Sequence, residues 1–133
     1  MNKPFPESDL PAYAQSLGIS VHGMDGEYPV LTVAFGPTIE GRPGHFHGGA
    51  TAGLLETAGY AALRRVLLRE QRALTMKPIN ITMQYLAAGK QLQTYAIGRI
   101  TRLGRRNANI AVEAWQSDRA RPIATAVMNI LTG

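Results

Sequence analysis

Hydrophobic residues repeat at helical spacing from about Gly48 to Glu70, and this stretch predicts a single long helix. Two glycines open the helix, and two more, Gly53 and Gly59, lie inside it. Each interior glycine costs a helix about 1 kcal/mol relative to alanine. We therefore expect both positions to pack closely against a sheet, with a smooth first part of the helix that a strand or a ligand can approach.

Four β-like segments follow the helix and are joined by short turn-like sequences. They cover residues 77–86, 91–103, 107–117 and 122–131. In the first segment, apolar and polar residues alternate, with Ile79, Ile81, Met83 and Tyr85 on one face and Asn80, Thr82 and Gln84 on the other. This alternation predicts a half-buried strand whose polar face is wet or functional, so Asn80 and Thr82 are candidate substrate contacts.

The part of the chain before the long helix predicts a short helix and a hairpin. A serine N-cap, a first-turn proline and a terminal glycine favour the short helix within residues 1–18. The pair Asp25-Gly26 is a hairpin signal between two short strands. Two strands, a helix and four closely joined strands require an antiparallel sheet with the helix over one face. We therefore expect an α+β fold in one domain, residues 1–133.

Composition narrows the class of protein. The chain has 133 residues, of which 45% are hydrophobic and 17% charged, and it contains no run of the about 18 apolar residues that a membrane helix needs. Its first residues hold no apolar segment of the kind found in secretory signals, and it has no cysteine. We therefore expect a cytoplasmic globular protein without a membrane partner, without disulfides and without cysteine chemistry.

The net charge of +5 suggests an anionic partner. One basic cluster surrounds Gly104 and contains Arg99, Arg102, Arg105 and Arg106. Basic surfaces bind nucleic acid, but the aromatic residues are few and do not alternate with this cluster, as a base-stacking platform requires. We therefore do not expect nucleic acid as the partner.

Glu56 is a single carboxylate among the alanines and leucines of the long helix. Ala52 and Tyr60 lie one turn away on either side, and no lysine or arginine occupies a neighbouring position on that face. A partly desolvated carboxylate without a cationic partner has a raised pKa and suits general-base catalysis. The alternative is that the helix turns Glu56 into water.

The N-terminus of the helix can stabilise negative charge on an oxygen atom. The backbone N–H groups of Gly48, Gly49 and Ala50 are expected to be free there, and the helix dipole adds about half a positive charge. Gly48 and Glu56 are eight residues apart, or about 12 Å along the helix. A carbonyl oxygen and its attacking group lie only about 3 Å apart, so one helix cannot easily supply both partners. The spacing indicates a site shared by two antiparallel chains.

Other chemistries fit the sequence less well. His45 and His47 lack a third metal ligand nearby, so we expect no metal, and His47 is a candidate cap that fixes the loop before the helix. No serine lies in a G-x-S-x-G motif, and there is no phosphate-binding loop of the P-loop type. The glycine-rich stretch does not follow a strand of a βαβ unit, which argues against a dinucleotide cofactor.

Several of these features occur together in one known family. The motif His47-Gly48-Gly49, the acid Glu56, a strand that ends in Tyr85 and the segment 98–115 resemble the hotdog-fold acyl-CoA thioesterases of the phenylacetate-pathway and 4-hydroxybenzoyl-CoA type. The likeness covers the chain from about residue 27 to the end. HGG alone is a weak motif, but HGG with an acid at this spacing and four following strands is a fairly strong one.

The resemblance implies a long helix wrapped by an antiparallel sheet of five to six strands, in homodimers that often pair into tetramers. It implies hydrolysis of an acyl-CoA thioester with no separate cofactor. The Gly48 amide would polarise the thioester carbonyl, Glu56 of the partner subunit would be general base or nucleophile, and His47 would hold loop and substrate. Further substrate contacts would be Gly49, Tyr60, Asn80 and Thr82, with Arg102, Gly104, Arg105 and Arg106 on the CoA phosphates. For the arginines, an ordinary solvated hairpin is the alternative.

The chain departs from the family pattern at three positions. It has Gly41 where many relatives have asparagine, Pro78 where relatives often have a hydroxyl residue, and Tyr60 where some have threonine. Tyr60 can hydrogen-bond Glu56 or shorten the acyl pocket, and the small residues beside it favour an aryl or medium-length acyl group. The alternatives to hydrolysis are an acyl-CoA-binding domain without turnover and a hydratase, whose acid–histidine motif is absent here.

Overall fold

The computed structural model describes residues 4–133. A single 3-10 turn, η1 (Glu7–Asp9), and a short helix, α1 (Ala12–Ser16), precede the strands β1 (Ser20–Asp25) and β2 (Tyr28–Val33). The long helix α2 (Gly48–Arg69) follows, and then come β3 (Lys77–Tyr85), β4 (Thr94–Leu103), β5 (Asn107–Trp115) and β6 (Ala124–Leu131). Every element expected from the sequence is present, with the strands one to three residues shorter at some ends. The expected serine cap of the short helix is wrong, because Ser8 lies in η1 and α1 begins after Pro11.

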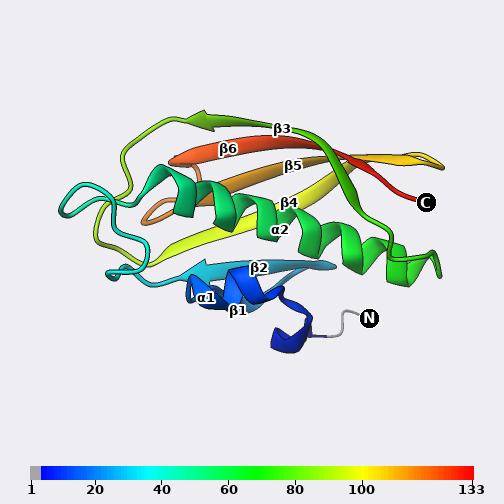
Figure 1. Cartoon of the computed structure of the whole chain (residues 1–133), viewed down its shortest axis with the longest axis horizontal. Helices are drawn as coiled ribbons and strands as arrows, with labels where there is room; N and C mark the ends of the chain where they lie inside the picture. The colour runs from blue at the N-terminus through cyan, green and yellow to red at the C-terminus, as the bar shows by residue number, and fades with distance from the viewer. Residues whose placement is uncertain (1–3) are drawn as a thin grey trace.

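The six strands form one antiparallel sheet in the order β1-β2-β4-β5-β6-β3. The sheet curves around α2, so that strands appear on both sides of the helix in Figure 1. One long helix wrapped by a six-stranded antiparallel sheet is the hotdog fold, which confirms the expectation for the fold. Although α2 has 22 residues, neither it nor any other helix within residues 4–133 is apolar enough to span a membrane.

The helix and the sheet approach most closely at two glycines. A Cβ atom added to Gly98 of β4 would lie 2.9 Å from the carbonyl oxygen of Ala58 and 2.9 Å from the Cα atom of Gly59. A Cβ atom on Gly59 would collide with Met128 of β6. The prediction that Gly59 packs against the sheet is therefore confirmed, because helix and strand backbones touch here.

Gly53 has a different neighbour, and its predicted packing against the sheet is wrong. A Cβ atom there would lie 3.0 Å from Leu17 and 3.2 Å from the ring of Tyr13. Both side chains belong to the segment around α1, which contacts α2 here. The glycine therefore accommodates the N-terminal segment.

β3 is more exposed than its alternation predicted. Ile81 and Met83 pack partly against the core, but Ile79 and Tyr85 are each 56% exposed. The reason is the position of β3 at the edge of the sheet, where within residues 4–133 it pairs with β6 alone. One chain therefore leaves part of the apolar face of this strand uncovered.

Candidate functional site

His47 caps the N-terminus of α2. Its Nδ1 atom accepts a hydrogen bond of 2.9 Å from the amide of Gly49, and its carbonyl oxygen accepts from Ala50 N at 3.0 Å and Thr51 N at 3.1 Å. Because Nδ1 is an acceptor, the neutral ring carries its hydrogen on Nε2. The capping role expected for His47 is thus present, and the ring also lines a cavity at this end of the helix.

This cap leaves one free amide at the start of the helix. The amides of Gly49 and Ala50 are both used by His47, so the expectation of three free amides is wrong for these two. Among residues 4–133, no group accepts a hydrogen bond from the amide of Gly48. Its carbonyl oxygen accepts a hydrogen bond of 3.0 Å from the Tyr85 hydroxyl. The Gly48 amide is therefore the hydrogen-bond donor that this end of α2 offers to an anion.

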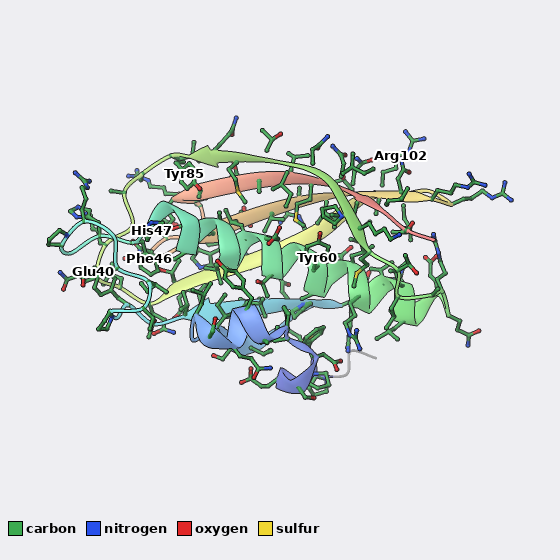
Figure 2. All side chains as sticks on the ribbon, viewed as in Figure 1. Glu40, Phe46, His47, Tyr60, Tyr85 and Arg102 are labelled. Carbon is green, nitrogen blue, oxygen red and sulfur yellow. The ribbon has the colours of Figure 1, made fainter. Side chains whose placement is uncertain are left out.

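A cavity of about 530 Å3 lies beside Gly48. Its walls are the loop before α2, the segment after β3 and Ile123, and Figure 2 shows His47, Phe46 and Tyr85 together at this end. Phe46 is buried, and its amide donates a hydrogen bond of 3.1 Å to the carbonyl of Gly89, which ties the two walls together. An acyl or thioester group has room here.

Gly41, one of the departures from the family pattern, has a structural reason. A Cβ atom at this position would lie 2.9 Å from the Cα atom of His47. The amide of Gly41 donates to the carbonyl of His45 at 2.9 Å, so the loop folds tightly against the cap. A larger residue at position 41 would require this loop to move away from the helix.

Glu56 lines a second cavity, of about 430 Å3, halfway along α2. Tyr60 and Arg64 follow on the same face of the helix. Met76 and two further residues of α2 also line it. The remaining wall comes from the N-terminal segment, namely from Phe5, Asp9, Leu10, Pro11 and Tyr13. This segment therefore forms one wall of the cavity.

The carboxylate of Glu56 is half-buried and has no donor or ion-pair partner within residues 4–133. Tyr60 lies one turn further along α2 and lines the same cavity, and its pKa is raised first by burial and second by the negative charge of Glu56. Arg64 points to the other end of the cavity, where its Nε atom lies 3.4 Å from Asp9 Oδ2. Glu56 is thus available to accept a proton.

A single chain does not bring Gly48 and Glu56 together. The two cavities share no described residue, and eight residues of helix, about 12 Å, separate the two groups. Tyr60 lines the same cavity as Glu56, and Gly49 follows Gly48 at the start of α2. This geometry agrees with the argument from spacing that one helix cannot supply both catalytic groups.

Asn80 and Thr82 lie apart from both cavities. Asn80 Oδ1 accepts a hydrogen bond of 2.6 Å from the side chain of Asn129, which in turn accepts from Asn109. These amides form a row across β3, β6 and β5 on the sheet face opposite α2, since their neighbours Ala108 and Ile110 are buried. In one chain, the row stabilises the edge of the sheet.

The arginine hairpin, residues 102–106 where β4 turns into β5, lies at the far end of α2 from His47, as the labels of His47 and Arg102 in Figure 2 show. Arg102, Arg105 and Arg106 are exposed, and none forms an ion pair within the part of the chain that the structure describes. At Gly104 an added Cβ atom would lie 2.7 Å from Asn107 Oδ1, so the side chain of Asn107 would have to move. Three cationic side chains are therefore available to an anion.

The sequence does not reveal two parts of the candidate site. Tyr85 was expected only as the end of a strand, although the alternation of β3 does place it on the helix side. The N-terminal segment was expected as a short helix, with no sign that it forms a wall beside Glu56. Both contacts join residues distant in the chain, so local patterns do not reveal them.

Histidines and acids do not gather into a metal site in the described chain. Within residues 4–133, no three such side chains form a metal-ligand group. His45 Nδ1 lies 3.1 Å from the carbonyl of Pro43, and His47 Nδ1 accepts from Gly49 of α2, so each imidazole has a backbone contact.

Comparison with known proteins identifies the family of this chain. A family model described as the thioesterase superfamily matches residues 43–123, which include the cap, α2 and the arginine hairpin. No curated protein sequence matches the chain.

Solved structures show the same fold. A Haemophilus influenzae thioesterase is 18% identical over 98% of this chain and 92% of its own, with a TM-score of 0.82. The E. coli PaaI protein of the phenylacetic acid degradation operon is 19% identical over 95% and 87%, with a TM-score of 0.79. A Shewanella oneidensis protein related to the thioesterase superfamily is 21% identical over 94% and 89%, with a TM-score of 0.80. With the family model matching more than half of its residues, the chain belongs to the thioesterase superfamily.

Proposed function

We propose that this protein hydrolyses acyl-CoA thioesters at a site shared by the two chains of a homodimer. The observation that carries the proposal is the pair of unpartnered groups, the Gly48 amide and the Glu56 carboxylate, each lining its own cavity within residues 4–133. Membership of the thioesterase superfamily supports thioester hydrolysis as the type of reaction.

In the proposed reaction, the thioester carbonyl oxygen accepts a hydrogen bond from the Gly48 amide at the positive end of the helix dipole. Glu56 of the partner subunit removes a proton from water, and the water oxygen attacks the carbonyl carbon. The carbon–sulfur bond then breaks, and the CoA thiolate takes up the proton held by Glu56, which leaves the free carboxylic acid and restores the Glu56 carboxylate. The Nε2–H group of His47 is a second donor to substrate in this cavity.

A covalent route uses the same groups. The Glu56 carboxylate attacks the thioester carbon, CoA thiolate leaves, and the mixed anhydride is then hydrolysed by water. Both routes give the same products and both require the carboxylate. Glutamine at position 56 should therefore slow either one.

The homodimer in this proposal is supported by the edge strand β3. Ile79 of β3 is 56% exposed and Val127 of the neighbouring strand is 53% exposed, which is unusual for large apolar residues beside an unpaired strand edge. Pairing of two such edges would bring Ile79 next to the partner chain and would run the two helices antiparallel, whereas Val127, between the buried Ala126 and Met128, faces the side of the sheet away from α2. Assembly of two dimers into a tetramer stays a prediction.

The remaining substrate contacts are proposals of the same kind. Gly49 as a substrate contact stays a prediction, because the His47 ring lies over it and accepts from its amide. Tyr60 lines the second cavity, and Arg102, Arg105 and Arg106 around Gly104 bind the phosphates of CoA. Asn80 and Thr82 as substrate contacts stay a prediction, as does a cytoplasmic location. We expect neither a metal nor a redox cofactor in the reaction.

The test is release of free thiol from short, medium, long and aryl acyl-CoAs by the wild type and by Glu56→Gln. General-base assistance contributes about 10²–10⁴ in rate, so we expect a loss of that size in the variant. Glu113→Gln is the matched control, because Glu113 lies on the sheet face opposite α2 and pairs with Arg99 at 3.4 Å. A wild type that binds these compounds without turnover would make the protein a binding domain, and a fully active Glu56→Gln would remove Glu56 from the mechanism.

A further inference from the structure

A sharp turn after the end of α2 directs Arg72 toward the arginine hairpin. Gln71 has a φ of 56°, in the left-handed region that residues other than glycine seldom adopt. The amide of Arg72 donates a hydrogen bond of 2.8 Å to the carbonyl of Leu67, which closes the helix end. The side chain of Arg72 therefore starts from a fixed point.

The guanidinium of Arg72 holds the backbone of the turn between β4 and β5. Its Nη2 atom donates to the carbonyl oxygens of Gly104 and Arg105, both at 3.0 Å, and lies 3.4 Å from Thr132 Oγ1. The next carbonyl, that of Arg106, accepts from the amide of Thr132 at 2.7 Å. Three successive carbonyl oxygens of the turn are thus engaged on the inner side.

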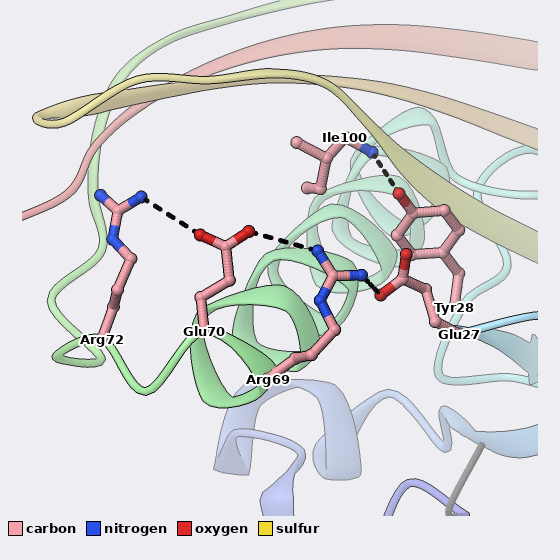
Figure 3. A network of polar contacts seen from close by, with 6 residues as sticks. All are labelled: Glu27, Tyr28, Arg69, Glu70, Arg72 and Ile100. Carbon is pink, nitrogen blue, oxygen red and sulfur yellow. Dashed lines mark hydrogen bonds and ion pairs between the residues drawn. The ribbon is translucent and has the colours of Figure 1, made fainter. Parts of the chain in front are cut away.

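The other side of the guanidinium is held from the helix. Figure 3 shows Arg72 in a chain of ion pairs that continues through Glu70 and Arg69 to Glu27. The distance from Arg72 Nη1 to Glu70 Oε1 is 4.0 Å, and that from Arg69 Nη2 to Glu70 Oε2 is 3.3 Å. Arg72 therefore links the end of α2 to the hairpin.

This link has an electrostatic consequence. Carbonyl oxygens carry partial negative charge and would repel an anion, but here a cation covers those of Gly104 and Arg105. On the outer side, Arg102, Arg105 and Arg106 are exposed and form no ion pair within residues 4–133. A hollow of about 530 Å3, lined by Arg72, Leu103, Gly104 and Arg105, lies beside them.

We infer that Arg72 is a positioning residue that holds the hairpin in the shape in which its exposed arginines bind the phosphates of the CoA nucleotide. The inference rests on the proposed function for the identity of the ligand. Arg72 acts through the turn and does not touch the reacting atoms. Its replacement should therefore weaken recognition of the nucleotide and leave the chemical step unchanged.

The experiment compares one acyl group on CoA and on pantetheine, which lacks the nucleotide. For Arg72→Met, we expect KM for the acyl-CoA to rise about tenfold, equivalent to about 1.4 kcal/mol, with kcat and the KM for acyl-pantetheine unchanged. Arg72→Lys keeps the charge but not the planar fork of donors, so it should recover only part of the affinity. The control is Arg121→Met, since the Arg121 side chain is 89% exposed and outside both cavities.

Two results would overturn the inference. One is an unchanged KM for acyl-CoA in Arg72→Met, and the other is an equal rise of KM for both substrates, which a general structural role would cause. If Arg72→Met does not fold, as judged by circular dichroism, Arg72→Lys carries the same comparison against the wild type.

Calorimetric binding of adenosine 3′,5′-bisphosphate separates this inference from the proposed function. A wild type that binds the nucleotide more tightly than Arg72→Met, yet hydrolyses no thioester, would support the role of Arg72 and contradict the hydrolase. A wild type that hydrolyses both substrates with the same KM and does not bind the nucleotide would support the hydrolase and contradict the role of Arg72.

Discussion

The hydroxyl of Tyr85 donates a hydrogen bond of 3.0 Å to the carbonyl oxygen of Gly48, and so joins the end of β3 to the first residue of α2. On the other side of Gly48, the carbonyl of His47 accepts hydrogen bonds from the amides of Ala50 and Thr51. The peptide groups before and after the Cα atom of Gly48 are therefore both anchored. The free amide of Gly48 has a fixed direction before substrate arrives, which is what an oxyanion donor requires.

Tyr85→Phe tests this anchoring. A hydrogen bond contributes about 0.5–1.5 kcal/mol, so loss of the hydroxyl should lower kcat about two- to tenfold through a less rigid Gly48 amide. KM should change little, because the aromatic ring remains beside the cavity. The measurement is steady-state thioester hydrolysis.

Tyr95→Phe is the matched control, because it removes a hydroxyl from a tyrosine that stacks on Trp115 in a cluster away from both cavities. An unchanged kcat in Tyr85→Phe, or a change confined to KM, would show that the Tyr85 hydroxyl does not hold the amide.

Gly48→Pro removes the amide hydrogen at the first helical position, where proline is well tolerated. His47 has φ −67° and ψ 133°, an extended conformation that a following proline permits. Loss of one oxyanion donor typically costs about 10²–10³ in kcat, and we expect a decrease of this size.

Gly48→Ala keeps the amide hydrogen and is the control for this change. Its Cβ atom would lie 3.8 Å from the Tyr85 ring, an ordinary contact, so most of the activity should remain. Equal activity of the proline and alanine variants would mean that the Gly48 amide takes no part in catalysis.

Mixed dimers test whether the two chains share a site. Gly48→Pro and Glu56→Gln should each be inactive alone, but a dimer with one chain of each has one site with both changes and one site with neither. Random mixing of the two inactive proteins should therefore restore about a quarter of the wild-type activity. Coexpression with two different affinity tags isolates the mixed species. Its complete inactivity would place Gly48 and Glu56 of one site in the same chain.

Much of the fold follows from local patterns. The apolar periodicity that begins at Gly48 predicts α2 to within one residue at its end, and four strand-like segments after it are four strands. The position of β3 at the sheet edge does not follow from its own alternation. That position depends on pairing with β6, in which Asn80 lies opposite Asn129, and the exposure of Ile79 follows from it.

The candidate site shows the same division. The sequence singles out HGG and Glu56 because glycine destabilises a helix and burial of an unpaired carboxylate is unfavourable, so both indicate a functional role. Of the three amides expected to be free, that of Gly49 donates to the His47 side chain and that of Ala50 to the His47 carbonyl oxygen. The first contact depends on the rotamer of one side chain, which a local pattern does not reveal. The contacts of Arg72 join residues more than thirty positions apart, and a single basic residue after a helix carries no signal of them.

Gly98→Ala should destabilise the protein. The added Cβ atom would lie 2.9 Å from the carbonyl oxygen of Ala58, and a helix backbone cannot move aside as a side chain can. Overpacking of this kind costs about 1–3 kcal/mol in the free energy of unfolding, measured by urea denaturation. Gly23→Ala in β1 is the control, because no atom lies within 4 Å of its added Cβ. Equal stability of the two variants would mean that α2 and β4 are farther apart than described.

Tyr60 reports on the charge of Glu56. Its pKa is raised above the ordinary 10.0, mainly by burial and secondly by the Glu56 carboxylate. The native state therefore holds this proton more tightly than the unfolded state does. The resulting stability is complete below the unfolded pKa of about 10 and is lost as pH rises through the native pKa.

Glu56→Gln should lower the pKa of Tyr60 toward its ordinary value without reaching it, because burial is the larger cause and remains. Tyrosinate absorbance across an alkaline titration measures the change, and Tyr60→Phe identifies which of the five tyrosines in the chain is responsible. The stability of Tyr60→Phe should fall less steeply than that of the wild type at alkaline pH. An identical Tyr60 titration in the wild type and Glu56→Gln would show that the Glu56 carboxylate does not lie close to the Tyr60 hydroxyl.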